Sequence, residues 1–178
     1  MKLSEEMKNK TLLSFELFPP KTEKGLQNLP GTIDHLMKYN PSYISCTYGA
    51  GGGNVGANRE VCQMIKNAGT TPVTHFTVIK NTKEGIKEQL DQYLADGVDH
   101  MLALRGDCGP NERHFMPHPQ GHTHAVDLVR QIAAMNRGQF VDGEVEECHH
   151  SKFSIGVAGY PEVHAEARDI TSDIARLR

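Results

Sequence analysis

Glu16 is the first residue whose type and position could do chemistry. It is the only carboxylate in the apolar stretch LLSFELFPPK, Leu12 to Lys21, which ends in a double proline. Burying an ionised carboxylate among apolar groups costs several kcal/mol unless its pKa rises. A carboxyl group with a raised pKa suits general acid catalysis near neutral pH, at the mouth of a barrel for example. A solvated carboxylate on an edge strand is the plainer alternative, and residue spacing alone does not separate the two.

Two short loops could bind an anionic or polar ligand. The stretch TYGAGGG, 47–53, could cradle phosphates through backbone N–H groups, although it matches neither GxGxxG nor a Walker loop. The stretch ALRGD, 103–107, places an arginine, a glycine and a carboxylate at the end of a predicted strand. A flexible loop and a turn with a solvated Arg–Asp pair are the alternatives.

The histidines suggest a metal site at first sight. Seven of the ten lie between His114 and His164, mainly in the loop-like stretches 114–124 and 147–150. No pair combines helical HxxxH spacing with a partner carboxylate. We therefore expect adventitious binding of nickel or zinc and no dedicated metal site.

These residues must be positioned by a regular succession of elements. The pattern predicts strands at 12–18, 42–49, 72–79, 100–107 and 153–161, and helices at 25–40, 58–69, 82–97, 124–136 and 163–178. Strict alternation predicts a parallel sheet with helical crossovers, and mostly apolar strands predict that both faces are covered. Polar and glycine residues gather just after the strands, so we expect the ligand site at that end of the sheet.

Composition narrows the class of protein. A net charge of −3, from 19 basic and 22 acidic residues, gives no reason to expect nucleic acid or an anionic membrane as a partner. No apolar run approaches the roughly 18 residues of a spanning helix, and the charged start lacks an apolar signal core. The scattered Cys46, Cys62, Cys108 and Cys148 form no CxxC pair, which predicts free thiols in a reducing cytoplasm.

Five motifs carry a family resemblance. SFELFPPK, YISCTYGAGG, HFT, ALRGD and AGYPEVHAEA occur in the order and approximate spacing found in methylenetetrahydrofolate reductases, and the chain resembles that family from about Thr11 to Arg178. The resemblance implies an α/β fold of the TIM (β/α)8-barrel type that carries FAD. It also implies reduction of 5,10-methylenetetrahydrofolate to 5-methyltetrahydrofolate with NADH or NADPH as co-substrate, a step of one-carbon metabolism towards methionine.

The resemblance also implies roles for single residues. Glu16 would be the acid that protonates N10 of the bridged folate and opens its five-membered ring, before hydride from the flavin reaches the methylene carbon. Asp107 would be a carboxylate near both flavin and pterin, and Thr47 would also lie near the nicotinamide. The residues at FAD-binding positions are Thr47, Tyr48, Ala50, His75, Arg105, Gly106, Asp107, Ala125, Tyr160, His164, Ala167 and Asp173.

The length of the chain differs from that of a whole barrel. A (β/α)8 barrel takes about 250 residues, and 178 residues supply about five of its eight units. We expect one α/β domain over 1–178, the N-terminal part of a reductase barrel. It could be a fragment of a longer product, it could be completed by a second copy or a partner chain, or it could be a rearranged smaller nucleotide-binding domain. We favour a truncated product, with a homo-oligomer or a complementing chain covering the exposed edge.

Four functions stay open at this point. The first is an active reductase, and the second is a catalytically incompetent FAD- or nucleotide-binding fragment that needs its missing C-terminal part or a partner chain. The third is an unrelated barrel aldolase or decarboxylase that uses Glu16 and Asp107, although no predicted strand core carries a Schiff-base lysine. The fourth is a metal-binding protein built on the histidine-rich loops.

Overall fold

Five parallel strands form the centre of the protein. The computed structural model describes residues 3–48, 55–107, 115–140 and 150–177. The strands are β1 (Ser14–Leu17), β2 (Tyr43–Cys46), β3 (Thr71–Thr77), β4 (His100–Leu104) and β5 (Ser154–Val157), and they lie in the order β1-β2-β3-β4-β5. The helices are α1 (Leu3–Glu6), α2 (Glu23–Met37), α3 (Val55–Asn67), α4 (Lys83–Ala95), α5 (Ala125–Met135) and α6 (Ile170–Leu177). The predicted alternation of five strands and five helices is confirmed, and α1 is an addition.

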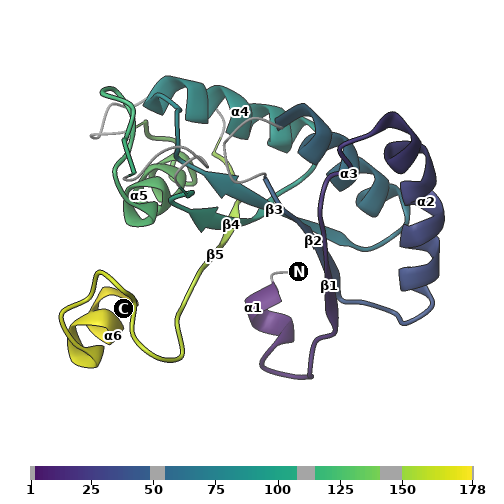
Figure 1. The fold of residues 1–178 in the computed structure, drawn as a ribbon, viewed down its shortest axis with the longest axis horizontal. Coiled ribbons are helices and arrows are strands. Elements are labelled where there is room, and N and C mark those ends of the chain that lie inside the picture. Colours follow the sequence, from purple (N-terminus) through teal and green to yellow (C-terminus); the bar gives the residue numbers. More distant parts are fainter. Residues whose placement is uncertain (1–2, 49–54, 108–114, 141–149, 178) are drawn as a thin grey trace.

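Helices α2 to α5 all lie on one side of the sheet, while α1 and α6 lie on the other side (Figure 1). Consecutive strands are always neighbours, so right-handed crossovers place successive helices on the same face. A doubly wound sheet reverses its strand order and carries helices on both faces. The predicted barrel-type α/β class is therefore confirmed with five units. The prediction that both faces of the sheet are covered is wrong for β1, whose Ser14 and Glu16 are exposed on the side away from α2 to α5.

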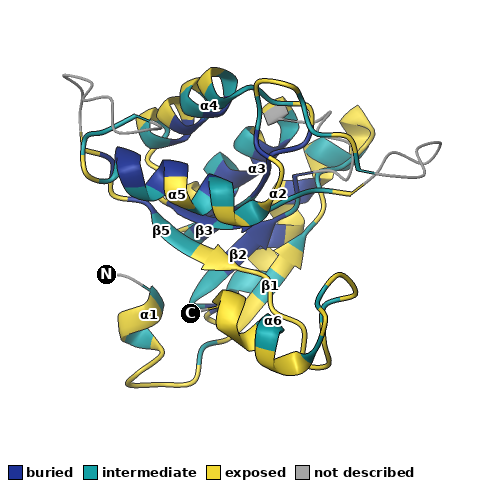
Figure 2. Ribbon diagram, turned by 90° about the vertical axis from the view of Figure 1, so that its left-hand side faces the viewer, coloured by how far each residue is buried: buried dark blue, intermediate teal, exposed yellow. Residues whose placement is uncertain are grey.

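The hydrophobic core lies between the sheet and helices α2 to α5, where Figure 2 shows most of the buried residues. Alternate strand residues point into it, because successive side chains of a strand face opposite ways. The strand residues in this core are Phe15, Leu17, Ile44, Cys46, Phe76, Met101, Ala103 and Ile155. The helices contribute buried residues such as Ile33, Ile65, Leu90 and Ile132.

The other strand residues face away from this core, onto what we call the open face of the sheet. In the register, Glu16 pairs with Ser45 and Ser45 pairs with Val73. His75 follows two residues after Val73 and pairs with Leu102. Strand β1 is exposed at every second residue, including Glu16. The open face therefore carries Glu16, Ser45 and His75 beside apolar residues such as Val73 and Leu102.

Two helix ends show how local sequence sets the boundaries. Helix α4 begins after Thr82, whose hydroxyl accepts a hydrogen bond of 2.9 Å from Gly85 N–H, and it stops at Gly97 with φ +70°. Both ends match the prediction. The sequence predicted a helix from residue 163, whereas helix α6 begins only at Ile170. Asp169 Oδ1 accepts from Ser172 N–H at 2.8 Å, and Ser172 Oγ accepts from Asp169 N–H at 3.2 Å, which is a reciprocal cap.

Replacing Thr82 with alanine is expected to lower the free energy of unfolding by about 0.5–2 kcal/mol, because the first turn of α4 loses its capping acceptor. Urea denaturation followed by circular dichroism measures this change. Thr123→Ala is the matched control, since Thr123 is exposed and has no side-chain hydrogen bond to a described residue. Equal midpoints for the two variants would contradict the capping role.

None of the described helices is both long and apolar enough to cross a membrane. Cys46 and Cys62 are buried free thiols, as predicted, while Cys108 and Cys148 lie outside the described residues.

Candidate active site

The carboxyl ends of β1, β2 and β3 bring Glu16, Thr47 and His75 together on the open face. Glu16 Oε2 lies 3.5 Å from His75 Nε2, although strand β2 separates their backbones. Ser45, which pairs with Glu16, is small enough for the two longer side chains to meet above β2. Thr47 and His75 come one residue beyond the paired Cys46 and Thr74, so they are neighbours on adjacent strands.

Glu16 is not surrounded by its apolar sequence neighbours. Phe15 and Leu17 pack into the core on the helix side, and the Glu16 side chain remains 49% exposed on the open face. The expectation of a carboxylate buried in an apolar strand is therefore wrong for this structure. The physical reason is the two-residue period of a strand, which sends adjacent side chains to opposite faces. The half-exposed Glu16 carboxylate lies beside the His75 ring.

His75 is the more buried partner of this pair, with a side chain that is 12% exposed. Burial lowers its pKa below the ordinary value of 6.5, and the nearby Glu16 carboxylate opposes this with a smaller upward effect. His75 is therefore neutral at pH 7.

The pKa of His75 gives a testable pH dependence. Because its pKa is lower in the folded state than in the unfolded chain, the unfolded chain binds more protons near pH 6, and stability falls as the pH drops below about 6.5. Glu16→Gln is expected to lower the pKa of His75 further, because it removes the attraction of the carboxylate. NMR titration of the ring protons measures both values. Glu60→Gln, an exposed change on α3, should leave the His75 pKa unaltered, and a rise in Glu16→Gln would contradict the assignment.

Tyr48 follows Thr47 but points the other way. Its side chain is 1% exposed, its ring lies 5.1 Å from that of Phe76, and its hydroxyl donates to Gln89 Oε1. Burial raises the pKa of Tyr48 to about 12. The structure thus places the Tyr48 ring in the helix-side core and leaves only its backbone at the strand end. Ala50, next in the predicted set, lies outside the described residues.

A second group of predicted site residues lies where β4 and β5 end. Arg105 Nη1 donates to both carboxylate oxygens of Glu166, at 2.8 and 3.0 Å, and its guanidinium carbon lies 5.0 Å from the centre of the Phe115 ring. Hydrogen bonding and attraction by Arg105 lower the pKa of Glu166. The Arg105 guanidinium is thus held by two contacts, one with the Glu166 carboxylate and one with the Phe115 ring.

His164 connects most of the remaining predicted residues. Its ring lies 5.0 Å from the Tyr160 ring, and its backbone N–H donates to Asp173 Oδ2 at 2.8 Å. Ala167 N–H donates to His164 O at 2.8 Å. Nδ1 of His164 accepts from Glu166 N–H at 3.1 Å, so a neutral ring carries its proton on Nε2. Arg105, Tyr160, His164, Ala167 and Asp173 therefore form one connected group through Glu166, which we call the Arg105 cluster.

The other predicted residues are less directly connected. Gly106 has φ +90°, and an added Cβ would lie 2.9 Å from Ile79, so this position requires glycine. Asp107 is exposed at the end of β4, with no hydrogen bond to any described residue, and Ala125 is the first residue of α5. The structure thus places them around the same end of the sheet without joining them to Glu16.

Two residues of the site were not predicted, and a third, Thr77, was expected only as one of the polar residues gathered after the strands. Glu166 lies inside the AGYPEVHAEA motif, whose spacing could have suggested a partner for Arg105. Thr77, at the end of β3, is 4% exposed, and its Oγ1 has no hydrogen-bond partner in the described part of the protein. Asn58 on α3 is fully buried against the end of β2. No periodicity marks these last two, because their positions depend on contacts between elements.

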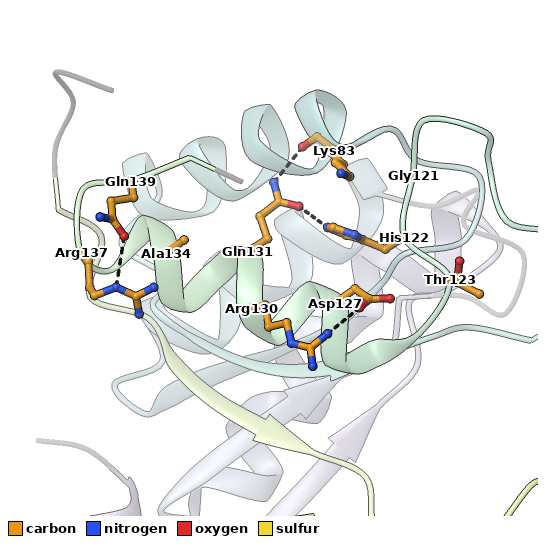
Figure 3. Close-up of a pocket in the computed structure, with 10 residues that line it drawn as sticks. All are labelled: Lys83, Gly121, His122, Thr123, Asp127, Arg130, Gln131, Ala134, Arg137 and Gln139. Carbon is orange, nitrogen blue, oxygen red and sulfur yellow. Dashed lines mark hydrogen bonds and ion pairs between the residues drawn. The ribbon is translucent and has the colours of Figure 1, made fainter. Parts of the chain in front are cut away.

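A groove of about 550 Å³ lies elsewhere, on the helix layer between α4 and α5 (Figure 3). Its lining includes Lys83, His122, Asp127, Arg130, Gln131 and Arg137. His122 Nε2 and Gln131 Oε1 are 2.6 Å apart, and Gln131 Nε2 donates to Lys83 O at 2.8 Å, so the buried polar atoms there bond to one another. Within the described ranges, no three His, Cys, Asp or Glu residues are grouped as metal ligands.

Comparison with known proteins gives a consistent result. Residues 2–178 match the family described as methylenetetrahydrofolate reductase. The chain is 32% identical over 174 residues to 5,10-methylenetetrahydrofolate reductase of Salmonella typhimurium, covering 97% of this chain and 52% of that protein. It is 33% identical over 159 residues to methylenetetrahydrofolate reductase (NADH) 1 of Zea mays, covering 89% of this chain and 25% of that protein. The chain thus spans about half the length of the bacterial relative and a quarter of the plant relative.

Proposed function

Because the chain belongs to the methylenetetrahydrofolate reductase family, we propose that it takes part in the FAD-dependent reduction of 5,10-methylenetetrahydrofolate to 5-methyltetrahydrofolate, with NADH or NADPH as the electron source. The observation that carries this proposal is the position of Glu16. It is a carboxyl group at the end of β1, half exposed on the open face and beside a histidine that is neutral at pH 7.

Glu16 acts as the proton donor in this proposal. Its side chain is accessible to a ligand on the open face, as a general acid must be. It donates a proton to N10 of the bridged folate, so that the C–N10 bond breaks and a cation forms at the methylene carbon and N5. His75 Nε2, at 3.5 Å from Glu16 Oε2, helps to orient the carboxyl group.

The residues present fit a flavin nucleotide. Arg105 binds a carboxylate through two N–H···O contacts of 2.8 and 3.0 Å, and a phosphate accepts the same arrangement. His164 offers an Nε2–H donor beside it, and Tyr160 offers an exposed ring. The Thr77 hydroxyl at the end of β3 has no hydrogen-bond partner among the described residues, so it can form a hydrogen bond with a ligand. FAD, when bound, supplies the hydride that reaches the methylene carbon.

The remaining predicted residues take supporting roles. Thr47 and His75 line the end of the open face, Gly106 lets the backbone turn there, and Asp107 provides an exposed carboxylate for the polar edge of a pterin. Asp173 and Ala167 hold the His164 loop through backbone hydrogen bonds. Ala50 and Ala125 complete the cofactor-binding set that the family resemblance implies.

The open face favours association in the working protein. A second copy or a complementing chain would cover the side chains that helices α2 to α5 leave exposed. The alternative function is a module that binds FAD or another nucleotide but turns over folate only when so completed. We keep this alternative because the chain spans only about half the length of the bacterial relative.

Visible absorbance of the purified chain tests the proposal. The chain is mixed with excess FAD, freed of unbound flavin by gel filtration, and then reduced anaerobically with NADH or NADPH before methylenetetrahydrofolate is added. Retained flavin that is bleached by a nicotinamide and recoloured by the folate is the expected result. Flavin that is retained without reoxidation by folate would support the alternative, and no retained flavin would contradict the cofactor assignment for this chain.

A further inference from the structure

We propose that Asn58 is a positioning residue for the cofactor end of the sheet, because its side-chain amide clamps the carboxyl end of β2 and thereby fixes Thr47. This inference rests on the proposed function for its consequence, but its geometry stands independently. Asn58 lies in the first turn of α3, on the helix side of the sheet, and its side chain is completely buried.

The clamp consists of two hydrogen bonds from one amide group. Asn58 Nδ2 donates to Cys46 O and to Thr47 O, both at 3.0 Å. The register between β2 and β3 ends at Cys46 and Thr74, so these carbonyls lie where the backbone ladder stops. A buried carbonyl without a partner is costly, and the amide donates to one carbonyl in the last pair of the ladder and to one just beyond it.

The orientation of the amide is itself set by its surroundings. Asn58 Oδ1 accepts from Thr74 Oγ1 at 2.8 Å and from Tyr93 O–H at 2.7 Å, and Cys62 Sγ lies 3.6 Å away. These groups are donors to the oxygen, so the NH2 end must point at the two carbonyls. The side chain therefore joins α3, α4, β2 and β3 at one point.

The clamp determines where two consecutive side chains go. Thr47 N–H donates to Leu17 O at 2.9 Å while its carbonyl accepts from Asn58, so its backbone is held from both sides. Tyr48 then enters the helix-side core, and Thr47 stays on the open face next to His75. A displacement of about 1 Å at a reacting site can cost about 10²-fold in rate, so a fixed strand end matters for function.

The test separates positioning from general stability by using two kinds of variant. Asn58→Asp keeps the acceptor for Tyr93 and Thr74 but removes the N–H donors, and Asn58→Ser is a smaller replacement that cannot reach both carbonyls. Tyr93→Phe is the matched control, because it removes a hydrogen bond from the same network and leaves the clamp in place.

Amide hydrogen exchange without flavin is the first readout. In either Asn58 variant, the Thr47 amide is expected to exchange at least about tenfold faster relative to the Ser45 amide, whereas Tyr93→Phe should affect both amides equally. An unchanged ratio in the folded Asn58 variants would overturn the proposal. This result holds whether or not the chain binds FAD, so it distinguishes failure of the clamp from failure of the proposed function.

Flavin affinity is the second readout, at a temperature where circular dichroism shows all variants folded. The Kd for FAD, measured by quenching of flavin fluorescence, is expected to rise at least about tenfold in the Asn58 variants and to stay within about twofold in Tyr93→Phe. Equal changes in Kd for variants with equal losses of thermal stability would show that Asn58 is merely structural. Absence of binding by the unaltered chain would contradict the cofactor assignment and leave the exchange ratio to decide about Asn58.

Discussion

Replacing Glu16 with glutamine is expected to slow the reduction of methylenetetrahydrofolate by about 10²–10⁴-fold, the usual contribution of a positioned general acid. Glutamine keeps the size and polarity of the side chain but has no proton to give to N10. Reduction of bound flavin by NADH or NADPH needs no such proton and should stay within about twofold of the unaltered rate. Stopped-flow absorbance of the flavin measures the two half-reactions separately.

Glu60→Gln is the matched control, since Glu60 is an exposed glutamate on α3, away from the open face. Both of its half-reactions should match those of the unaltered protein. If Glu16→Gln slowed both half-reactions to the same degree, the carboxylate would serve the structure or the cofactor, and the general acid assignment would be wrong. A lower pKa of His75 in Glu16→Gln would link the slower folate reduction to the observed contact between Glu16 and His75.

Replacing Phe76 with alanine is expected to lower the free energy of unfolding by about 3–5 kcal/mol, as for other buried phenylalanines. Phe76 is completely buried, and its ring lies between those of Tyr48 and Tyr93, at 5.1 and 6.2 Å. The change removes one aromatic ring from a cluster that joins β3, α4 and the end of β2. Since a domain is stable by only about 5–15 kcal/mol, this is a large fraction of the total.

Denaturant unfolding measures this loss, and Phe18→Ala provides the same chemical change at a surface position. Phe18 is 72% exposed just after β1, so its removal is expected to alter stability by no more than about 0.5 kcal/mol. Similar denaturation midpoints for the two variants would mean that the Phe76 ring does not stabilise the core. A lower midpoint for Phe76→Ala alone is the expected outcome.

Much of the fold was predictable because it depends on short-range patterns. The alternation of strands and helices follows from periodicity, and the start and end of α4 follow from Thr82 and Gly97. The late start of α6 was missed because a reciprocal cap between Asp169 and Ser172 competes with the apparent continuation of the helix from 163. The coverage of the sheet was misjudged because apolar strands are compatible with one or two covered faces.

Part of the candidate site was predicted from family motifs, and not from residue spacing or composition. The resemblance selected Glu16, His75, Arg105 and His164, and the structure places the first two in contact and the last two in one cluster. Glu166 and Asn58 carry no pattern of their own. They become meaningful only when a loop after β5 reaches Arg105 and when α3 packs on the end of β2.

The sequence by itself determined the order of elements, the parallel connection of the strands, the family and the residue types available for chemistry, because these depend on neighbours along the chain. Only the tertiary structure decided which face each side chain occupies and what it meets there. Glu16 lies in an apolar stretch yet is half exposed beside His75, and Tyr48 lies in a site motif yet packs in the core. The physical reason is that a strand alternates its side chains between two faces, and packing of the helices decides which face becomes the interior.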